Sequence, residues 1–305
     1  MGIRVGRYET LGAIASGGMA KVHLGRAVGM AGFERLVAIK LMHPHLAEDP
    51  AFVAMFLDEA RLAALIRHPN VVATIDVQNS DDGLFLVMEY VEGCSLGALL
   101  RKLEADERAV PLDVAVRLTL DVLAGLQAAH EQQGTDCAPL GLIHRDISPA
   151  NVLIGKDGAA RITDFGVARA EERISSTRGG ELKGKVPYMP PEQLRGLAVD
   201  QRVDVYAAGA VLWEVLVGRR LFRAPNEAAL LSAILAGAEA SPRELRPDVP
   251  EAIDQACMKA LAPDRDVRFF TAVEFADALE DAAVDAGAGV ATPRTVAKFV
   301  GALGV

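Results

Sequence analysis

Strand-like segments dominate the first third of the chain. Residues favoured in β-strands fill YETLGAIA at 8–15 and AKVHLGRAV at 20–28, and a short turn of serine and glycine joins them. VVATIDVQ at 71–78 and GLFLVMEYV at 83–91 have the same character. This part of the chain therefore predicts a small unit rich in strands.

A further strand is predicted by RLVAIKLM at 35–42. Because successive side chains of a strand point to opposite faces, Ala38 and Lys40 share one face and Val37 and Ile39 share the other. One face of this strand is thus expected to carry the lysine.

One helix is predicted within the strand-rich unit, by DPAFVAMFLDEARLAALIR at 49–67. Glu59 falls on its apolar stripe, where a buried carboxylate needs a partner, and Lys40 on the neighbouring strand is the expected one. The pair either presents the lysine to phosphate oxygens or is a purely structural salt bridge. The apolar residues at helical spacing are Phe52, Met55, Phe56, Leu62, Ala63 and Ile66.

Helical periodicity dominates the second part of the chain. PLDVAVRLTLDVLAGLQAAHEQQ at 111–133 begins with proline and carries a long apolar stripe. DVYAAGAVLWEVLVG at 204–218 is apolar on nearly every face, which predicts a helix buried inside a larger unit. Amphipathic helices are predicted at 250–261 and 271–283, and one more short helix at 291–305.

Composition and charge exclude several classes of protein. The 305 residues are 51% hydrophobic, enough for a sizeable core, and a net charge of -9 argues against a nucleic-acid partner. Cys94, Cys137 and Cys257 are odd in number and form no CxxC pair, which favours reduced thiols and a cytoplasmic location. The longest apolar run, near 205–217, is too short for a membrane span, so no membrane partner is expected within this chain.

Candidate chemistry first emerges in a predicted hairpin. NVLI, the turn GKDG and ARIT predict two short antiparallel strands. Asn151 opens the first strand and Asp164 follows the second, so both are expected at the open end of the hairpin. Two hard oxygen ligands placed in this way suit Mg²⁺, although two ordinary turn residues would give the same pattern.

Two neighbouring features are compatible with phosphate chemistry. Asp146 lies in the loop before Asn151, where a carboxylate can orient a hydroxyl and accept its proton, or where it is simply a loop or cap residue. The glycines of ASGGMAKV at 15–22 would let backbone amides approach phosphates, and they would equally suit any tight hairpin.

Together these segments resemble the protein kinases of the eukaryotic-like serine/threonine type. The motifs occur in the order ASGGMAKV, VAIK, a helix glutamate, HRDISPAN, DFG, PPE, DVYAAG and a late arginine, and several of their variants resemble bacterial members. The resemblance implies an α+β bilobal protein-kinase fold with ATP in the cleft. It implies a kinase domain at 8–283, with an N-lobe at about 8–91 and a C-lobe at about 92–283, followed by a helical tail at 284–305.

The resemblance also implies roles for the candidate residues. Lys40 would hold the α/β-phosphates and be positioned by Glu59, while Asp146 would orient and deprotonate the substrate hydroxyl. Asn151 and Asp164 would ligate Mg²⁺, or alternatively Mn²⁺. The residues expected around ATP are Ile14, Ala15, Ser16, Gly17, Gly18, Val22, Ala38, Lys40, Met88, Glu89, Val91 and Leu153.

Other matching positions are expected to be structural. Glu192 and Arg268 match a pair that ties the activation segment to the large lobe, and Asp204 matches the aspartate that anchors the catalytic loop. His144 and His130 are expected to be core histidines rather than zinc ligands.

The chain departs from the family pattern beside the catalytic aspartate. Ser148 stands where these kinases usually carry a lysine, and Lys185 stands where they usually carry a threonine. We hypothesise that Lys185 reaches toward Asp146 and supplies the missing charge, because positioning and charge neutralisation dominate phosphoryl transfer. A solvated lysine in a loop is the alternative. Ala15 and Ala20 also replace two glycines of the family's loop.

The activation segment is expected to work without strict dependence on phosphorylation. Glu181 occupies the usual phosphothreonine position and is predicted to pair with Arg145 through a fixed carboxylate. Ser175, Ser176 and Thr177 are candidate autophosphorylation sites, or simply an ordinary polar loop.

The function that the resemblance implies is ATP-dependent transfer of the γ-phosphate to protein serine and threonine hydroxyls, with autophosphorylation. A pseudokinase or ATP-binding scaffold is the alternative, supported by Ser148 and the alanines of the glycine loop. The segment YMPPEQ with Arg268 argues against a small-molecule kinase. The expected partners are ATP and protein substrates, and Ser95, at a position that reads basic substrates in some relatives, gives no support for arginine-rich target sites. No oligomeric state is predicted.

Overall fold

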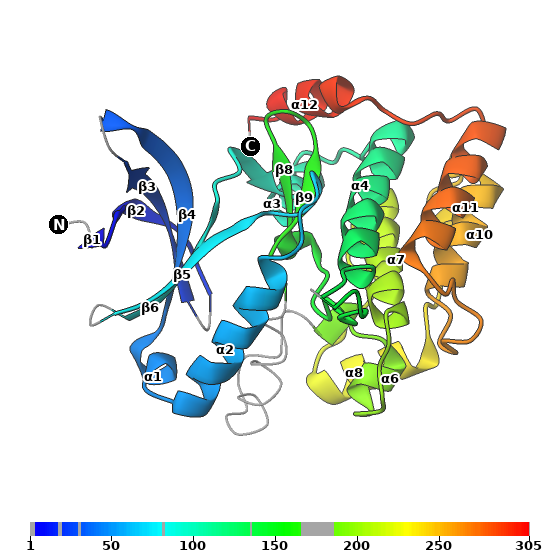
Figure 1. Cartoon of the computed structure of the whole chain (residues 1–305). Helices are drawn as coiled ribbons and strands as arrows, with labels where there is room; N and C mark the ends of the chain where they lie inside the picture. The colour runs from blue at the N-terminus through cyan, green and yellow to red at the C-terminus, as the bar shows by residue number, and fades with distance from the viewer. Residues whose placement is uncertain are drawn as a thin grey trace. The chain divides into compact units, whose positions relative to one another are not determined.

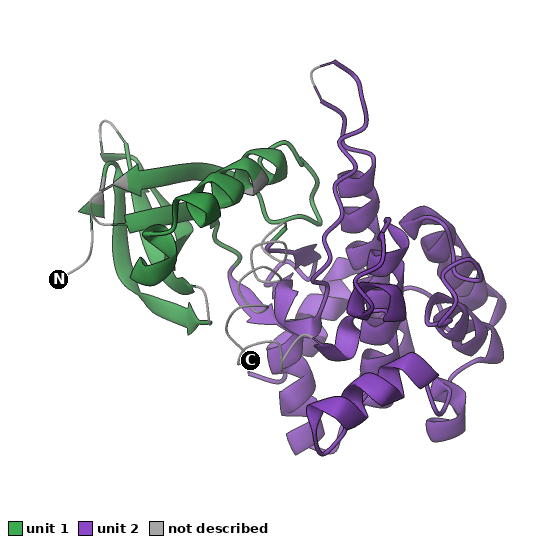
Figure 2. Ribbon diagram, turned by 90° about the horizontal axis from the view of Figure 1, so that it is seen from below, with its two compact units in different colours: residues 1–91, 165–181 green, residues 92–164, 182–305 purple. Residues whose placement is uncertain are grey.

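Two units with different secondary structure make up the described part of the chain. The computed structural model describes residues 4–17, 20–29, 32–80, 83–134, 136–165 and 186–304, apart from the side chains of Val5, Glu59 and Ser80. Unit 1 contains the described residues up to Val91 together with Phe165, and unit 2 contains those of 92–164 and 186–304 (Figure 2).

Unit 1 is built on a six-stranded antiparallel sheet in the order β1-β2-β3-β4-β6-β5 (Figure 1). Every long segment that was predicted as a strand contributes to this sheet. Its strands are β1 (Arg4–Val5), β2 (Tyr8–Ser16), β3 (Ala20–Val28), β4 (Glu34–Met42), β5 (Thr74–Ser80) and β6 (Gly83–Glu89).

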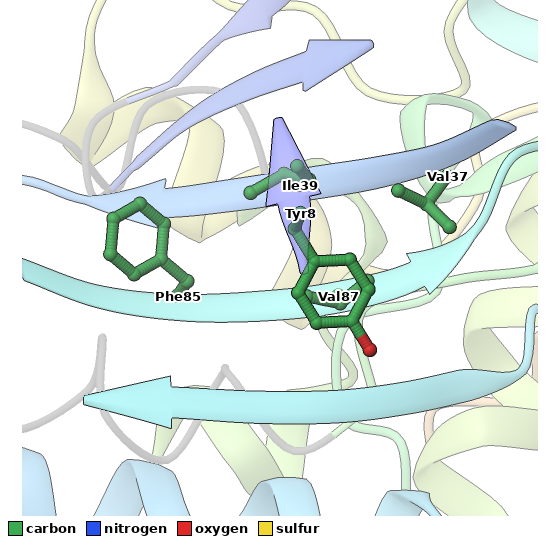
Figure 3. Packing of buried hydrophobic residues seen from close by; sticks show 5 residues of the cluster. All are labelled: Tyr8, Val37, Ile39, Phe85 and Val87. Atoms are coloured by element: carbon green, nitrogen blue, oxygen red, sulfur yellow. The ribbon is translucent and has the colours of Figure 1, made fainter. Parts of the chain in front are cut away.

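The register of β4 confirms the predicted division of its side chains. Lys40 lies opposite Val22, and Ala38 lies opposite Met88, so these residues share one face of the sheet. The other face carries an apolar cluster drawn from β2, β4 and β6 (Figure 3). This cluster consists of Tyr8, Val37, Ile39, Phe85 and Val87, each buried.

Helix α2 (Pro50–Ala63) follows the short helix α1 (Pro44–Ala47) and starts where it was predicted to start. Asp49 caps it by accepting hydrogen bonds from two backbone N–H groups of its first turn, and Pro50 occupies the first helical position. The helix ends earlier than predicted, because the N–H groups of Leu65 and Ile66 donate to carbonyls three residues back. This tighter final turn still buries Ile66.

Unit 2 is mainly helical, as predicted, and its larger helices pack on one another. Helix α4 contacts α7 and α11, and α10 contacts both of these (Figure 1). A small sheet, β7-β8-β9, packs on α4 through β9. The elements are β7 (Gly93–Ser95), α3 (Leu96–Ala105), α4 (Leu112–His130), η2 (Pro149–Asn151), β8 (Val152–Gly155), β9 (Ala160–Ile162), η4 (Val186–Tyr188), α6 (Pro191–Leu194), α7 (Arg202–Val217), α8 (Glu227–Ala236), α9 (Pro242–Leu245), α10 (Glu251–Ala260), α11 (Ala272–Asp285) and α12 (Pro293–Gly301).

Helix α7 is the buried centre of unit 2. All of its residues from Val203 to Leu216 are buried, which confirms the expectation from its uniformly apolar sequence. It ends at Gly218, whose φ of 81° is left-handed and whose N–H donates to the carbonyl of Glu214 at 2.8 Å. No helix in the described ranges is long and apolar enough to cross a membrane.

Helix α12 lies within the segment that was predicted to hold a last helix. Thr292 caps it by accepting a hydrogen bond from the N–H of Thr295 at 3.2 Å, and Ala291 just before it donates to the carbonyl of Asp113 at 3.1 Å. The helix contacts α4 and lies directly against Gly158 in the β8–β9 turn (Figure 1). The end of the described chain is therefore packed onto unit 2.

Candidate catalytic site

The hairpin of β8 and β9 positions both predicted metal ligands. Val152 pairs with Ile162, and the N–H of Thr163 donates to the carbonyl of Asn151 at 3.0 Å. Asn151 closes the 3-10 turn η2 directly before β8, so the strand begins one residue later than predicted. Asp164 follows two residues after β9, so both side chains belong to the open end of the hairpin, as expected.

Asn151 is tied to the predicted catalytic aspartate. Its side-chain N–H₂ group donates to Asp146 Oδ2 at 2.7 Å and to the Asp146 carbonyl at 2.9 Å. Both side chains are buried, with 7% and 5% of their surfaces exposed. No described residue donates a hydrogen bond to Asn151 Oδ1, so this oxygen is available to a cation.

The donor set at this end of the hairpin fits Mg²⁺. Asn151 offers an amide oxygen and Asp164 a carboxylate, which are hard oxygen ligands, and Mg²⁺ is usually bound by few protein groups together with phosphate and water. Within the described ranges, no group of three or more histidine, cysteine, aspartate or glutamate side chains could hold a metal ion.

Asp204 on α7 fixes the backbone of the catalytic loop. Its carboxylate accepts the N–H of His144 at 2.8 Å, the N–H of Arg145 at 2.7 Å and His130 Nε2 at 2.8 Å. Burial by itself would raise the pKa of Asp204, but the hydrogen bond from His130 and the backbone donor hold that pKa below its usual value. Arg145 has a φ of 64°, so the chain turns sharply just before Asp146.

His144 connects the catalytic loop to the hairpin. Its Nε2 lies 3.0 Å from the carbonyl of Thr163, and its Nδ1 accepts the N–H of Asp146 at 3.3 Å. Both ring nitrogens of His144 therefore have structural partners within the protein. The ring of His130 binds the carboxylate of Asp204.

The predicted structural ion pair is present. Arg268 donates to both carboxylate oxygens of Glu192, at 2.6 and 2.9 Å, and both side chains are buried. The guanidinium also lies over the ring of Tyr206, with 4.7 Å between its carbon and the ring centroid. The pair joins α6 to the loop that precedes α11.

Unit 1 places the other predicted residues on its sheet. Lys40 is buried on β4, with Val22 and Ala38 nearby on the same face. The side chain of Glu59 is outside the description of α2, so its pairing with Lys40 stays a prediction. Ile14 is 51% exposed on β2.

The remaining ATP candidates divide between the two units. In unit 1, Met88 is buried and Glu89 is half-buried on β6, and Val91 follows that strand. Gly17 donates its N–H to the carbonyl of Ala20 at 2.9 Å, which closes the turn between β2 and β3. Exposed residues of this turn region are Ala15, Ser16 and Gly17. In unit 2, Leu153 is half-buried on β8.

Several predictions concern residues outside the described ranges. They are Gly18 in the glycine loop and Ser175, Ser176, Thr177, Glu181 and Lys185 in the activation segment. Ser148, the proposed counterpart of Lys185, is 4% exposed and lines a cavity that Val186 also lines. The pairing of Arg145 with Glu181 likewise stays a prediction.

Unit 2 also contains a cavity that was not predicted from the sequence. It has a volume of about 1130 Å³ and lies beside the loop after Asp146, against α3, η4, α8 and the end of α7. Four arginines line it, at positions 101, 219, 220 and 223. Arg219 and Arg220, which follow the buried helix α7, were a signal of local positive charge in the sequence. Arg101, however, lies more than a hundred residues away in the chain.

Comparisons with known proteins agree with this geometry. Residues 8–273 match the family described as "Protein kinase domain". Among curated proteins, the chain is 44% identical over 275 residues to "Tyrosine-protein kinase MasK" of Myxococcus xanthus, covering 90% of this chain and 43% of that protein. It is 36% identical to "Serine/threonine-protein kinase PksC" of Streptomyces coelicolor, covering 89% of this chain and 48% of that protein.

A solved structure shows the same fold. The crystal structure of the PknI kinase domain of M. tuberculosis superposes with a TM-score of 0.70 at 25% identity, covering 91% of this chain and 96% of that one. The chain spans less than half the length of the two curated relatives named above. Its protein-kinase fold, its catalytic-loop motif and its match over residues 8–273 have one explanation: the chain belongs to the protein kinase family, among relatives from bacteria.

Proposed function

We propose that this chain is a serine/threonine protein kinase that uses ATP and Mg²⁺, phosphorylates protein substrates and autophosphorylates. The observation that carries the proposal is the fixed pair of Asp146 and Asn151, 2.7 Å apart at their hydrogen bond. Asp204 holds the loop before this pair, and the hairpin brings Asp164 to the same end. This arrangement supports an active enzyme over a scaffold that only binds ATP.

Asp146 is the proposed catalytic base. Its Oδ2 accepts the Asn151 hydrogen bond, which orients the carboxylate. A carboxylate in this position orients the hydroxyl and accepts its proton as phosphate is transferred. The anchoring of the loop on Asp204 keeps this geometry in place before substrate binds.

Asn151 and Asp164 are the residues proposed to hold the metal. A bound Mg²⁺ would neutralise charge on the phosphate oxygens of ATP. Mn²⁺ has similar ligand preferences and is the alternative.

Unit 1 is proposed to bind the nucleotide. Lys40, positioned by Glu59, would contact the α/β-phosphates, and the backbones of Glu89 and Val91 would bind the adenine edge. Apolar contact with adenine is assigned to Ile14, Val22, Ala38, Met88 and Leu153, and contact with phosphates to the turn at 15–18. The burial of Lys40 on the same sheet face as Val22 and Ala38 supports this assignment.

Lys185 is proposed to take the place of the missing lysine of the catalytic loop. The residue that follows it, Val186, lines the same cavity as Ser148, which supports a short separation between the two segments. The cytoplasmic location expected from the cysteine content stays a prediction.

The proposal also states which hydroxyl groups are phosphorylated, those of serine and threonine. The motif resemblance and the similarity to PksC, which is named a serine/threonine-protein kinase, favour serine and threonine. The similarity to MasK, which is named a tyrosine-protein kinase, favours tyrosine as the alternative. Incubation with radiolabelled ATP, Mg²⁺ and a generic protein substrate, followed by identification of the labelled amino acids, separates the two. Labelled serine and threonine that disappear in Asp146→Asn are expected. Label on tyrosine alone would overturn the serine/threonine assignment, and no label above the Asp146→Asn background would overturn the kinase proposal.

A further inference from the structure

The cavity beside the catalytic loop has a size and position suited to a peptide. Ser148, Pro149 and Ala150 form part of its wall and follow Asp146 by only two to four residues. Its volume of about 1130 Å³ exceeds the roughly 300–1,000 Å³ of small-molecule pockets. Leu100, Leu230 and other apolar side chains line it between the charged groups. Every described lining residue belongs to unit 2.

Four arginines from separate segments converge on this cavity. Arg101 projects from α3, while Arg219, Arg220 and Arg223 follow the left-handed turn at Gly218 that ends α7. All four are exposed to solvent. In the part of the chain that is described, the guanidinium groups of the first three form neither a hydrogen bond nor an ion pair.

The acidic residues of the cavity neutralise these arginines only in part. Glu104 is paired with Arg223 at 3.1 Å. Glu214 accepts a hydrogen bond of 2.6 Å from the hydroxyl of Tyr188, and burial raises the pKa of Glu214 even though the nearby Arg220 opposes that rise. Glu227 on α8 is the third acidic residue in the wall. Among the described lining residues, four arginines against three glutamates leave an excess of one positive charge, in a chain whose net charge is -9.

We propose that this cavity selects protein substrates that carry an anionic side chain close to the target hydroxyl, with Arg101, Arg219 and Arg220 as the specificity-determining residues. The inference rests on the proposed kinase function and adds the class of substrate to it. Guanidinium groups match both carboxylate and phosphate geometry, so aspartate, glutamate and a previously phosphorylated serine are all suitable anions. The cavity is positive although the chain as a whole is negative, so its charge also steers anionic substrates toward the site.

The test uses peptides that differ only beside the target serine. One alanine-rich peptide series has glutamate, phosphoserine, alanine or arginine at the flanking positions, and kcat/KM is measured for each with the whole chain. We expect kcat/KM to be about tenfold higher with either anion than with arginine, as for a charge-assisted contact at an exposed site. The preference should shrink as salt rises, because salt screens exposed charges. The ratio between phosphoserine and glutamate then identifies which anion the site favours.

Two variants and a matched control locate the preference. Changing Arg101, Arg219 and Arg220 together to alanine should bring the ratio of kcat/KM for glutamate over arginine peptides close to one. The double variant Arg219→Glu and Arg220→Glu should reverse the ratio in favour of arginine, which a folding defect cannot do. The control removes three exposed arginines of unit 2 that lie outside the cavity wall, by changing Arg108, Arg195 and Arg294 to alanine, and should keep the wild-type ratio.

The outcomes separate this inference from the proposed function. Phosphorylation that depends on Asp146 but is equal for all flanks, or a control that loses the preference to the same extent, overturns the inference and leaves the kinase proposal standing. If no peptide is phosphorylated, the inference is tested by the binding of fluorescent peptides with alanine at the target position, measured by anisotropy. If no peptide is phosphorylated but anionic peptides bind more tightly through the three arginines, the cavity assignment is supported and the proposed catalysis fails.

Discussion

Among single residues, Asp204 has the largest structural influence on the catalytic loop. It is fully buried on α7 and accepts two backbone N–H groups and one imidazole. A buried carboxylate with this set of donors keeps the loop in a strained turn, since Arg145 has a positive φ. The sequence pointed to Asp204 only through the family resemblance, because an aspartate in an apolar helix carries no local signal of its partners.

Replacing Asp204 by alanine should strongly destabilise unit 2. The change leaves two buried N–H groups and an imidazole without an acceptor, and the loss of one partner of such a set costs about 3–5 kcal/mol. The free energy of unfolding measured by urea denaturation checks this. Asp285→Ala, at an exposed end of α11, is the control and should change it by less than about 0.5 kcal/mol. Equal losses in the two variants would contradict the anchoring role.

The lowered pKa of Asp204 also predicts a pH dependence. A carboxyl whose folded pKa lies below its unfolded value of about 3.9 contributes stability that is complete above that value. This contribution is lost as the pH falls from about 4 through the folded pKa. The unfolding free energy of the wild type should therefore converge on that of Asp204→Ala in this acidic window, and a constant gap between them would contradict the assignment.

Ser148 and Lys185 are predicted to act as an exchanged pair. If the lysine supplies the charge that the catalytic loop lacks, Lys185→Ala should lower kcat by roughly 10–100-fold. The double variant Ser148→Lys with Lys185→Thr should regain most of the activity that Lys185→Thr alone loses. Measured kcat values decide between this and a solvated lysine. Lys183→Ala, two residues earlier, is the matched control and should keep the wild-type kcat. Unchanged turnover in Lys185→Ala would contradict the hypothesis.

Among the elements, α12 is the one whose place could not have been predicted. Its helical sequence was evident, but its contact with the β8–β9 turn joins segments well over a hundred residues apart. Gly158 makes this contact possible, since a Cβ there would overlap the carbonyl oxygen of Pro293. By contrast, the burial of α7 and the two faces of β4 follow from local periodicity and were predicted correctly.

Gly158→Ala should therefore release α12 from unit 2. Gly141→Ala is the matched control, because both glycines have a positive φ but a Cβ at 141 meets no atom within 4 Å. The shared left-handed backbone costs about 1 kcal/mol in each variant, and the clash at Gly158 should add about 1–3 kcal/mol. Urea denaturation gives the difference, and hydrogen exchange should show faster exchange in α12 for Gly158→Ala alone. Equal destabilisation of the two variants would show that α12 does not depend on this contact.

On the scale of the whole molecule, the motifs and their order along the chain implied the protein-kinase fold through their resemblance to that family. Local backbone signals predicted some of its parts. The hairpin that carries Asn151 and Asp164 is an example, since its turn chemistry fixes which residues share its open end. The arginines of the cavity are the opposite case. Arg101 and the segment at 219–223 meet only because α3 and α7 pack into one unit, and no pattern along the chain encodes that meeting.

The charge distribution follows from the same folding. A chain with a net charge of -9 has a locally positive cavity beside its proposed catalytic base, while its sequence gave no support for basic target sites. The proposed substrate class is thus a property of tertiary structure. The cavity and the proposed catalytic base are connected by one loop, because Ser148, Pro149 and Ala150 line the cavity and follow Asp146 by two to four residues in the chain.

The most direct test of the central claim compares two matched peptides that differ only in having serine or tyrosine as the target. With ATP and Mg²⁺, kcat/KM is measured for the wild type and for Asp146→Asn. The proposed function predicts turnover of the serine peptide, weaker turnover of the tyrosine peptide, and a fall of about 10²–10⁴-fold in kcat for the variant. Turnover of the tyrosine peptide alone, or equal turnover by wild type and Asp146→Asn, would contradict it.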